Sequence, residues 1–128
     1  PVIQGWSVDE YVECIMMFNE VGIDLRKEPL VGIGSVCRRQ GTGEIENIMR
    51  TVSGMGINLH GFGVKAGGLS RYGQFLHSAD SMAWSFGARY GKKRCSDINH
   101  HESSQSCANC LTYALEWRNG LLSEGLIE

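Results

Sequence analysis

The chain has 128 residues, of which 42% are hydrophobic and 20% are charged, a composition that excludes a disordered segment and suits one packed domain. Its formal net charge of −2 excludes a general electrostatic attraction to nucleic acid. No apolar stretch approaches the roughly 20 residues of a membrane span and no secretory signal is visible, so we expect a cytoplasmic protein without membrane contact. Because Pro1 stands within an apolar run, we interpret the sequence as part of a longer protein.

The first predicted elements are a short strand at residues 2–5 and a helix that begins at Ser7. Ser7 and Glu10 have the spacing of a capping box, in which each side chain binds a free backbone amide of the first turn. Apolar residues recur on one face of this helix, at Val8, Tyr11, Val12, Ile15 and Met16. We expect Gly22 to end the helix in the left-handed conformation.

The same strand–helix unit then repeats. Residues 30–36 predict a buried strand, and Thr42 is expected to cap a second helix that Gly54 or Gly56 ends. The apolar face of that helix carries Ile45, Ile48, Met49 and Val52. Residues 59–64 predict a third strand and residues 69–76 a shorter helix. Residues 78–81 lie on or just after a fourth strand.

Alternating strands and helices with short connections predict parallel strands joined by right-handed crossovers. We interpret residues 1–90 as four βα-type units of an α/β fold, the C-terminal half of a (β/α)8 TIM barrel. An open doubly wound sheet is the alternative. Polar residues stand at the predicted carboxyl ends of the strands, namely Gln4, Ser35, Lys65 and Asp80. In a barrel these ends converge on one mouth, where active sites lie.

Residues 91–128 predict a zinc-binding segment and a last helix from near Leu111 to Leu122. The candidate ligands are Cys95, one of His100 and His101, and the CxxC pair Cys107 and Cys110. Two thiolates at this spacing can bind one ion from a single turn, and four protein ligands make a closed, structural zinc site. A redox pair or plain buried thiols are the alternatives. The odd total of five cysteines argues against a disulfide framework.

Two glycine pairs, Gly32-x-Gly34 and Gly61-x-Gly63, lack the complete dinucleotide and P-loop patterns. Small residues at strand ends leave room in a barrel mouth, and a bare backbone also lets a flat base approach its amides. The basic run at residues 89–94 has two interpretations as well, since it fits either a phosphate backbone or a solvated loop.

Together the strands resemble those of the tRNA-guanine transglycosylase superfamily, which includes archaeosine-type enzymes and phage or bacterial relatives that put deazapurines into DNA. Residues 2–5 (VIQG) look like the family's IVQG strand. Residues 31–36 (VGIGSV) and 59–63 (LHGFG) are similar to its next two strands. Asp80 follows Gly63 by 17 positions, which is about the family's spacing to its nucleophilic aspartate.

The cysteines resemble the family's zinc cluster, whose end Cys107-x-x-Cys110 matches. Gln105 stands where the first cysteine of the cluster would be, and no histidine follows Cys110. The resemblance therefore implies that Cys95 and an upstream histidine complete the ligand set.

The resemblance implies a pentosyltransferase that replaces guanine by a 7-deazaguanine, the base type of queuosine and archaeosine, in DNA or tRNA. Asp80 would form the covalent intermediate with the sugar. The purine or 7-deazapurine base would be bound by Gln4, by Gly34, Ser35 and Gly63, and Lys65 would pair with a phosphate. The general base would belong to a missing N-terminal half of the barrel, so we expect the isolated chain to be inactive. Its two open sheet edges also predict pairing with that half or a homodimer.

Each candidate residue has a structural interpretation too. Asp80 could cap a helix or a turn, Gln4 could pair with the backbone at its strand end, and Lys65 could be solvated. The alternative functions are a noncatalytic barrel paralogue that binds nucleic acid or a catalytic partner, and a small zinc-stabilised interaction protein.

Overall fold

The computed structural model describes residues 1–37, 39, 41–91, 93–101 and 106–128, with the side chain of His101 outside that description. The chain divides into two compact units, Pro1–Asp80 and Ser81–Glu128. Within the described residues, no helix is both long and apolar enough to cross a membrane.

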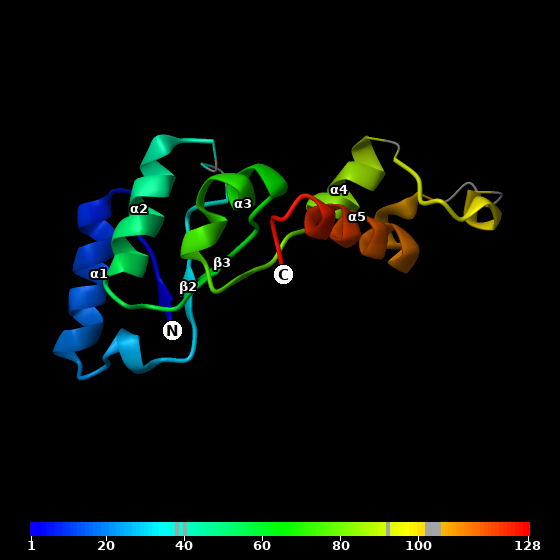
Figure 1. Cartoon of the computed structure of the whole chain (residues 1–128). Coiled ribbons are helices and arrows are strands. Elements are labelled where there is room, and N and C mark those ends of the chain that lie inside the picture. Colours follow the sequence, from blue (N-terminus) through cyan, green and yellow to red (C-terminus); the bar gives the residue numbers. More distant parts are fainter. Residues whose placement is uncertain (38, 40, 92, 102–105) are drawn as a thin grey trace. The chain divides into compact units, whose positions relative to one another are not determined.

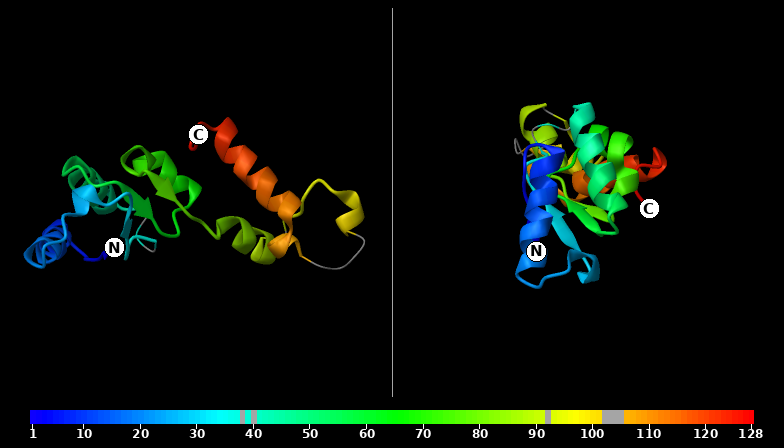
Figure 2. Two further views of the ribbon diagram at one scale, coloured as in Figure 1. Left: turned by 90° about the horizontal axis from the view of Figure 1, so that it is seen from below. Right: turned by 90° about the vertical axis from the view of Figure 1, so that its left-hand side faces the viewer.

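The N-terminal unit alternates strands and helices around a parallel sheet. Its elements are β1 (Val2–Ile3), α1 (Val8–Glu20), the 3-10 helix η1 (Leu25–Lys27), β2 (Val31–Ile33), α2 (Gly43–Gly54), β3 (Leu59–Gly61), α3 (Ala66–Tyr72), the 3-10 helix η2 (Gly73–Phe75) and β4 (Ser78–Ala79). The strand order is β1-β2-β3-β4, and every neighbouring pair is parallel. Helix α1 packs on α2 and α2 packs on α3, so the helices lie side by side along the sheet (Figure 1 and Figure 2).

The predicted ends of the first two helices are confirmed. Ser7 and Glu10 form the complete capping box of α1, and the side chain of Thr42 accepts a hydrogen bond at the start of α2. Gly22 and Gly56 follow the two helices, each with φ of 83°, a left-handed conformation that glycine adopts without steric cost. The prediction for Met16 was wrong, because this side chain is 56% exposed while Tyr11 and Ile15 face the core.

The strands and the third helix differ from the predicted boundaries. Strand β2 ends at Ile33 because Ser35 turns the chain with φ of 62°, and β3 ends at Gly61 because Gly63 does so with φ of 65°. Helix α3 covers Ala66–Tyr72 and so begins three residues earlier than predicted, and the 3-10 helix η2 follows it at Gly73–Phe75.

The two faces of the sheet carry different side chains because residues alternate along each strand. Ile3, Ile33 and Leu59 are fully buried in the core that the helices cover. The register aligns Val2 with Gly32, His60 with Gly32, and Ser78 with His60, in one row across the four strands. This row belongs to the alternate face, where Val2 is 44% exposed.

The C-terminal unit is helical and has a small core. It contains α4 (Ala83–Tyr90), the 3-10 helices η3 (Ile98–His101) and η4 (Cys107–Asn109), and α5 (Leu111–Ser123). Helix α4 packs against η4 and α5. The buried cluster comprises Ala88, Cys95, Cys107, Ala108 and Tyr113, with Trp84 and Cys110 packed against it. The cysteines are thus among the few groups that hold this unit together.

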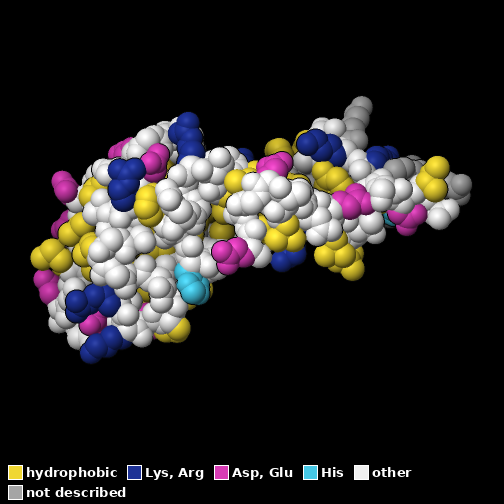
Figure 3. Space-filling model, viewed as in Figure 1, with side chains coloured by type: hydrophobic (Ala, Val, Ile, Leu, Met, Phe, Trp, Pro, Cys, Tyr) yellow, Lys and Arg dark blue, Asp and Glu magenta, His cyan; other side chains and the backbone are white. Residues whose placement is uncertain are grey.

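The surface of the N-terminal unit mixes charges of both signs. Figure 3 shows Lys and Arg side chains interspersed with Asp and Glu on the face in view. Among its exposed large apolar side chains is Trp6, which is 62% accessible to solvent.

Candidate functional site

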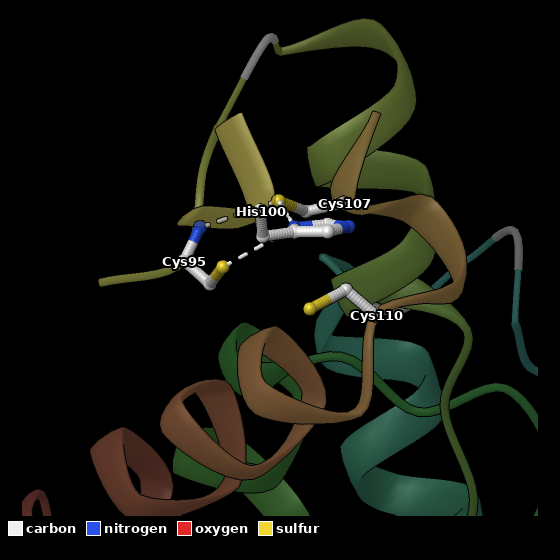
Figure 4. Close-up of side chains that lie close together, drawn as sticks. All are labelled: Cys95, His100, Cys107 and Cys110. Atoms are coloured by element: carbon white, nitrogen blue, oxygen red, sulfur yellow. Dashed lines mark hydrogen bonds between the residues drawn. The ribbon is translucent and has the colours of Figure 1, made fainter. Parts of the chain in front are cut away.

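Four side chains of the C-terminal unit converge in the arrangement of a metal centre. Cys95 precedes η3, His100 lies in η3, Cys107 begins η4 and Cys110 caps α5 (Figure 4). Their ligand atoms all lie within 4.8 Å of one another. His100 Nδ1 is 3.5 Å from Cys95 Sγ and 3.4 Å from Cys107 Sγ. Around a tetrahedral ion with metal–sulfur bonds of about 2.3 Å, neighbouring ligand atoms lie about 3.8 Å apart, so this cluster could bind a metal ion.

Backbone amides point at two of the sulfur atoms. The Cys95 N–H donates to Cys107 Sγ at 3.3 Å, and the Tyr113 N–H donates to Cys110 Sγ at 3.5 Å. The Tyr113 amide lowers the pKa of the Cys110 thiol, whereas burial raises the pKa of the Cys95 thiol to about 11. A cation at the centre would favour the thiolate form at both positions, because a bound thiol is deprotonated.

Helix α5 also anchors the loop that carries Cys95. The Ser96 N–H donates to both carboxylate oxygens of Glu116, at 3.1 and 3.2 Å. Among the described residues, His100 supplies the imidazole of the cluster. The alternative ligand, His101, has its side chain outside the described residues.

A second group of polar residues lies at the carboxyl ends of β3 and β4. Asp80 directly follows β4, and its Oδ1 accepts a hydrogen bond of 2.6 Å from the Gly63 N–H. Its Oδ2 lies 3.5 Å from His60 Nε2. The other ring nitrogen, His60 Nδ1, lies 2.8 Å from Ser78 Oγ. The Asp80 side chain remains 59% exposed, so a carboxylate with fixed orientation is open to a reactant.

The turn after β3 makes this arrangement. Gly63 adopts a left-handed φ, which aims its N–H at Asp80, while the Asp80 N–H returns a hydrogen bond of 3.2 Å to the Gly61 carbonyl. Sequence reasoning did not select His60. One signal in the sequence could have found it. His60 lies one residue before Gly61 in the predicted strand, and alternation along neighbouring strands can place it on the same sheet face as Ser78.

Three of the remaining predicted residues, Gln4, Gly34 and Ser35, lie just after the carboxyl ends of β1 and β2, whereas Lys65 follows β3. A Cβ on Gly34 would lie 3.1 Å from Gln4 Cγ, so the glycine gives the Gln4 side chain its space. The Tyr11 hydroxyl donates to the Gly34 carbonyl at 2.5 Å, which ties α1 to this strand end. Ser35 is exposed in the turn that follows, and Lys65 is exposed at the N-cap of α3.

Residues 1–126 match the family described as DpdA, DeoxyPurine in DNA protein A. The chain belongs to this family. DpdA is a family of the tRNA-guanine transglycosylase-like type, which confirms the resemblance at that level. Membership of DpdA indicates a part in deoxypurine modification and makes DNA the polymer concerned. No curated protein and no solved structure gives a significant match to the chain.

Proposed function

We propose that this chain is part of a base-exchange transglycosylase that replaces guanine in DNA by a 7-deazaguanine, with Asp80 as the nucleophile. The observation that carries the proposal is the exposed Asp80 carboxylate, oriented by the Gly63 amide and adjacent to His60. The DNA substrate follows from DpdA membership.

In the proposed reaction an oxygen of Asp80 attacks the anomeric carbon of the deoxyribose. The N-glycosidic bond breaks, its electron pair stays with N9 of guanine, and the departing base takes up a proton. The incoming base then loses its N9 proton, its nitrogen attacks the same carbon, and the Asp80 carboxylate is released. Two displacements retain the configuration of the sugar, as in retaining glycosidases.

Asp80 suits the first displacement for a geometric reason. The Gly63 amide engages Oδ1 at 2.6 Å, whereas the partner of Oδ2 among the described residues is the more distant His60 nitrogen at 3.5 Å. We propose that Oδ2 is the attacking atom, and that His60 keeps it directed toward the sugar.

We propose that the purine lies across the ends of β1 and β2. Gln4 would read its polar edge, while backbone groups of Gly34, Ser35 and Gly63 would bind the base, and Lys65 would contact a phosphate. The target nucleotide must leave its stack to reach such a pocket, as in other enzymes that act on bases in a duplex.

The sheet supports a half-barrel. With sequential strand order and right-handed crossovers, all helices fall on one side, as in a TIM barrel, whereas a doubly wound sheet reverses its strand order. The outer edges of β1 and β4 pair with no other strand among the described residues. We propose that four further βα units, or a second copy of the chain, close the barrel, and that the barrel half extends to residue 90.

We also propose that the cluster of Cys95, His100, Cys107 and Cys110 holds zinc as a structural ion. Three thiolates and one imidazole are ligands that zinc accepts in closed tetrahedral sites. The basic run at residues 89–94 precedes this cluster in the chain, and we propose that it contacts the DNA backbone. Residue 92 of this run lies outside the described residues.

The test is incorporation of labelled guanine or a 7-deazaguanine into duplex DNA, with tRNA as the competing substrate and the further barrel half supplied. Asp80→Asn should abolish incorporation, whereas Asp9→Asn, an exposed carboxamide substitution on α1, should leave it unchanged. Incorporation into tRNA alone would reject the DNA proposal. DNA binding without any incorporation would instead favour a noncatalytic member of the family.

A further inference from the structure

The side chains of Trp6 and Arg39 form a flat shelf just beyond the end of β1. The Arg39 guanidinium carbon lies 3.9 Å from the centroid of the Trp6 ring. Arg39 is only 8% exposed, whereas Trp6 is 62% exposed. The indole therefore rests on a buried cation and still presents most of its surface to solvent.

Both partners of this shelf are fixed by hydrogen bonds. The backbone N–H of Trp6 donates to Glu10 Oε2 at 2.5 Å, and the backbone carbonyl of Trp6 accepts from Arg39 Nη1 at 2.7 Å. Arg39 Nη2 donates to Glu44 Oε2 at 2.5 Å, so its charge already has a counter-ion. The Thr42 N–H and hydroxyl both donate to the Arg39 carbonyl. The Trp6 backbone and the guanidinium under its ring are therefore both anchored, which lowers the entropy cost of stacking another flat group on the ring.

The ion pair of Arg39 with Glu44 also indicates which kind of ligand this shelf would bind. A neutralised guanidinium is a poor site for a phosphate, so the exposed feature is the aromatic surface and not the charge. Aromatic rings stack on bases of any sequence, and a guanidinium on the far face adds a cation–π contact to the ring.

We propose that Trp6 is the stacking platform for an unstacked DNA base adjacent to the purine that is exchanged. Trp6 lies two residues after Gln4 on the same strand end, so a base on the indole would neighbour the purine whose edge Gln4 reads. This inference rests on the proposed function and adds to it a second base-binding position, one that would hold open the duplex around the target.

The probe is a DNA duplex with a single unpaired base, compared with the same duplex fully paired, in titrations of the whole chain. Trp6→Phe should keep the preference for the unpaired base. Trp6→Leu, which still covers Arg39 but has no ring, should weaken binding to the unpaired base by about 5- to 150-fold, the usual range for losing one stacked base. Met17→Ala is the control, since this apolar side chain on α1 is 61% exposed, and it should change nothing.

Thermal melting of each variant separates loss of stacking from loss of folding. Equal binding of the two duplexes by the unaltered chain, or an undiminished preference in a folded Trp6→Leu variant, would overturn the platform. Asp80→Asn distinguishes this inference from the proposed function, since that variant should lose base exchange but keep the preference for the unpaired base. If Asp80→Asn keeps base exchange, the nucleophile assignment fails while the Trp6 result stands.

Discussion

Replacement of Cys107 by serine should unfold the C-terminal unit and leave the N-terminal unit folded. Cys107 is fully buried, lies 3.4 Å from His100 Nδ1 and accepts the Cys95 amide. A serine hydroxyl keeps the approximate size of the side chain but supplies no thiolate for the metal. The effect therefore reports on metal binding more than on packing volume.

The expected magnitude follows from the small core of this unit. Two of the five residues in its buried cluster are proposed ligands, Cys95 and Cys107, and two more are alanines. At about 0.05–0.15 kcal/mol per residue, a unit of this size has roughly 2–7 kcal/mol of stability. Binding of a structural zinc ion contributes about 10–16 kcal/mol at pH 7. Losing the ion thus exceeds the whole stability of the unit.

The assay combines metal analysis with thermal melting followed by circular dichroism. The unaltered chain should hold one ion, and a strong chelator should remove the helical signal of α4 and α5 without melting the sheet. Cys37→Ser, at an exposed cysteine of the other unit, should keep both the ion and the melting profile. A Cys107→Ser chain that still holds one ion, or a chelated chain with unchanged melting, would refute the reasoning.

Three further substitutions test the packing of the N-terminal unit by urea unfolding. Tyr72→Phe removes a buried hydroxyl without a partner among the described residues, so it should raise the unfolding free energy by up to about 1–3 kcal/mol. Burial raises the pKa of Tyr72 to about 12, so this tyrosine ionises first in the unfolded chain, where its pKa is 10. The free energy of unfolding of the unaltered chain should therefore fall between pH 10 and about 12. Between pH 7 and pH 11 this free energy should fall less in Tyr72→Phe. Gly32→Ala would place a Cβ 2.5 Å from the Phe62 ring and should lower the free energy of unfolding by about 1–3 kcal/mol. The control Gly54→Ala places its Cβ in open space and should not lower it. Equal losses of stability in the two variants would contradict the clash. Ser7→Ala should cost about 1 kcal/mol through the lost helix cap, and unchanged amide exchange in the first turn would argue against that cap.

Local chemistry made several features of this protein predictable from sequence. The capping box of Ser7 and the left-handed Gly22 depend on neighbouring residues only, and both appear where they were expected. Strand β2 was visible because all three of its residues are buried, and buried parallel strands are continuous apolar runs. The CxxC pair indicated a cluster that could bind a metal ion, because two thiols at this spacing can reach one ion from a single turn. Each of these patterns is complete within a few residues.

Other features depend on contacts between distant segments, which only the tertiary structure decides. The pairing of His60 with Ser78 and Asp80 arises from the register of two strands, and that register depends on packing along the whole sheet. The shelf of Trp6 and Arg39 joins residues 33 positions apart. The grouping of His100 with three cysteines likewise depends on how segments 95–100 and 107–110 pack together. Sequence by itself determined the local elements and the types of ligand; the partners were decided by how the chain packs, because a contact across the fold has no local signature.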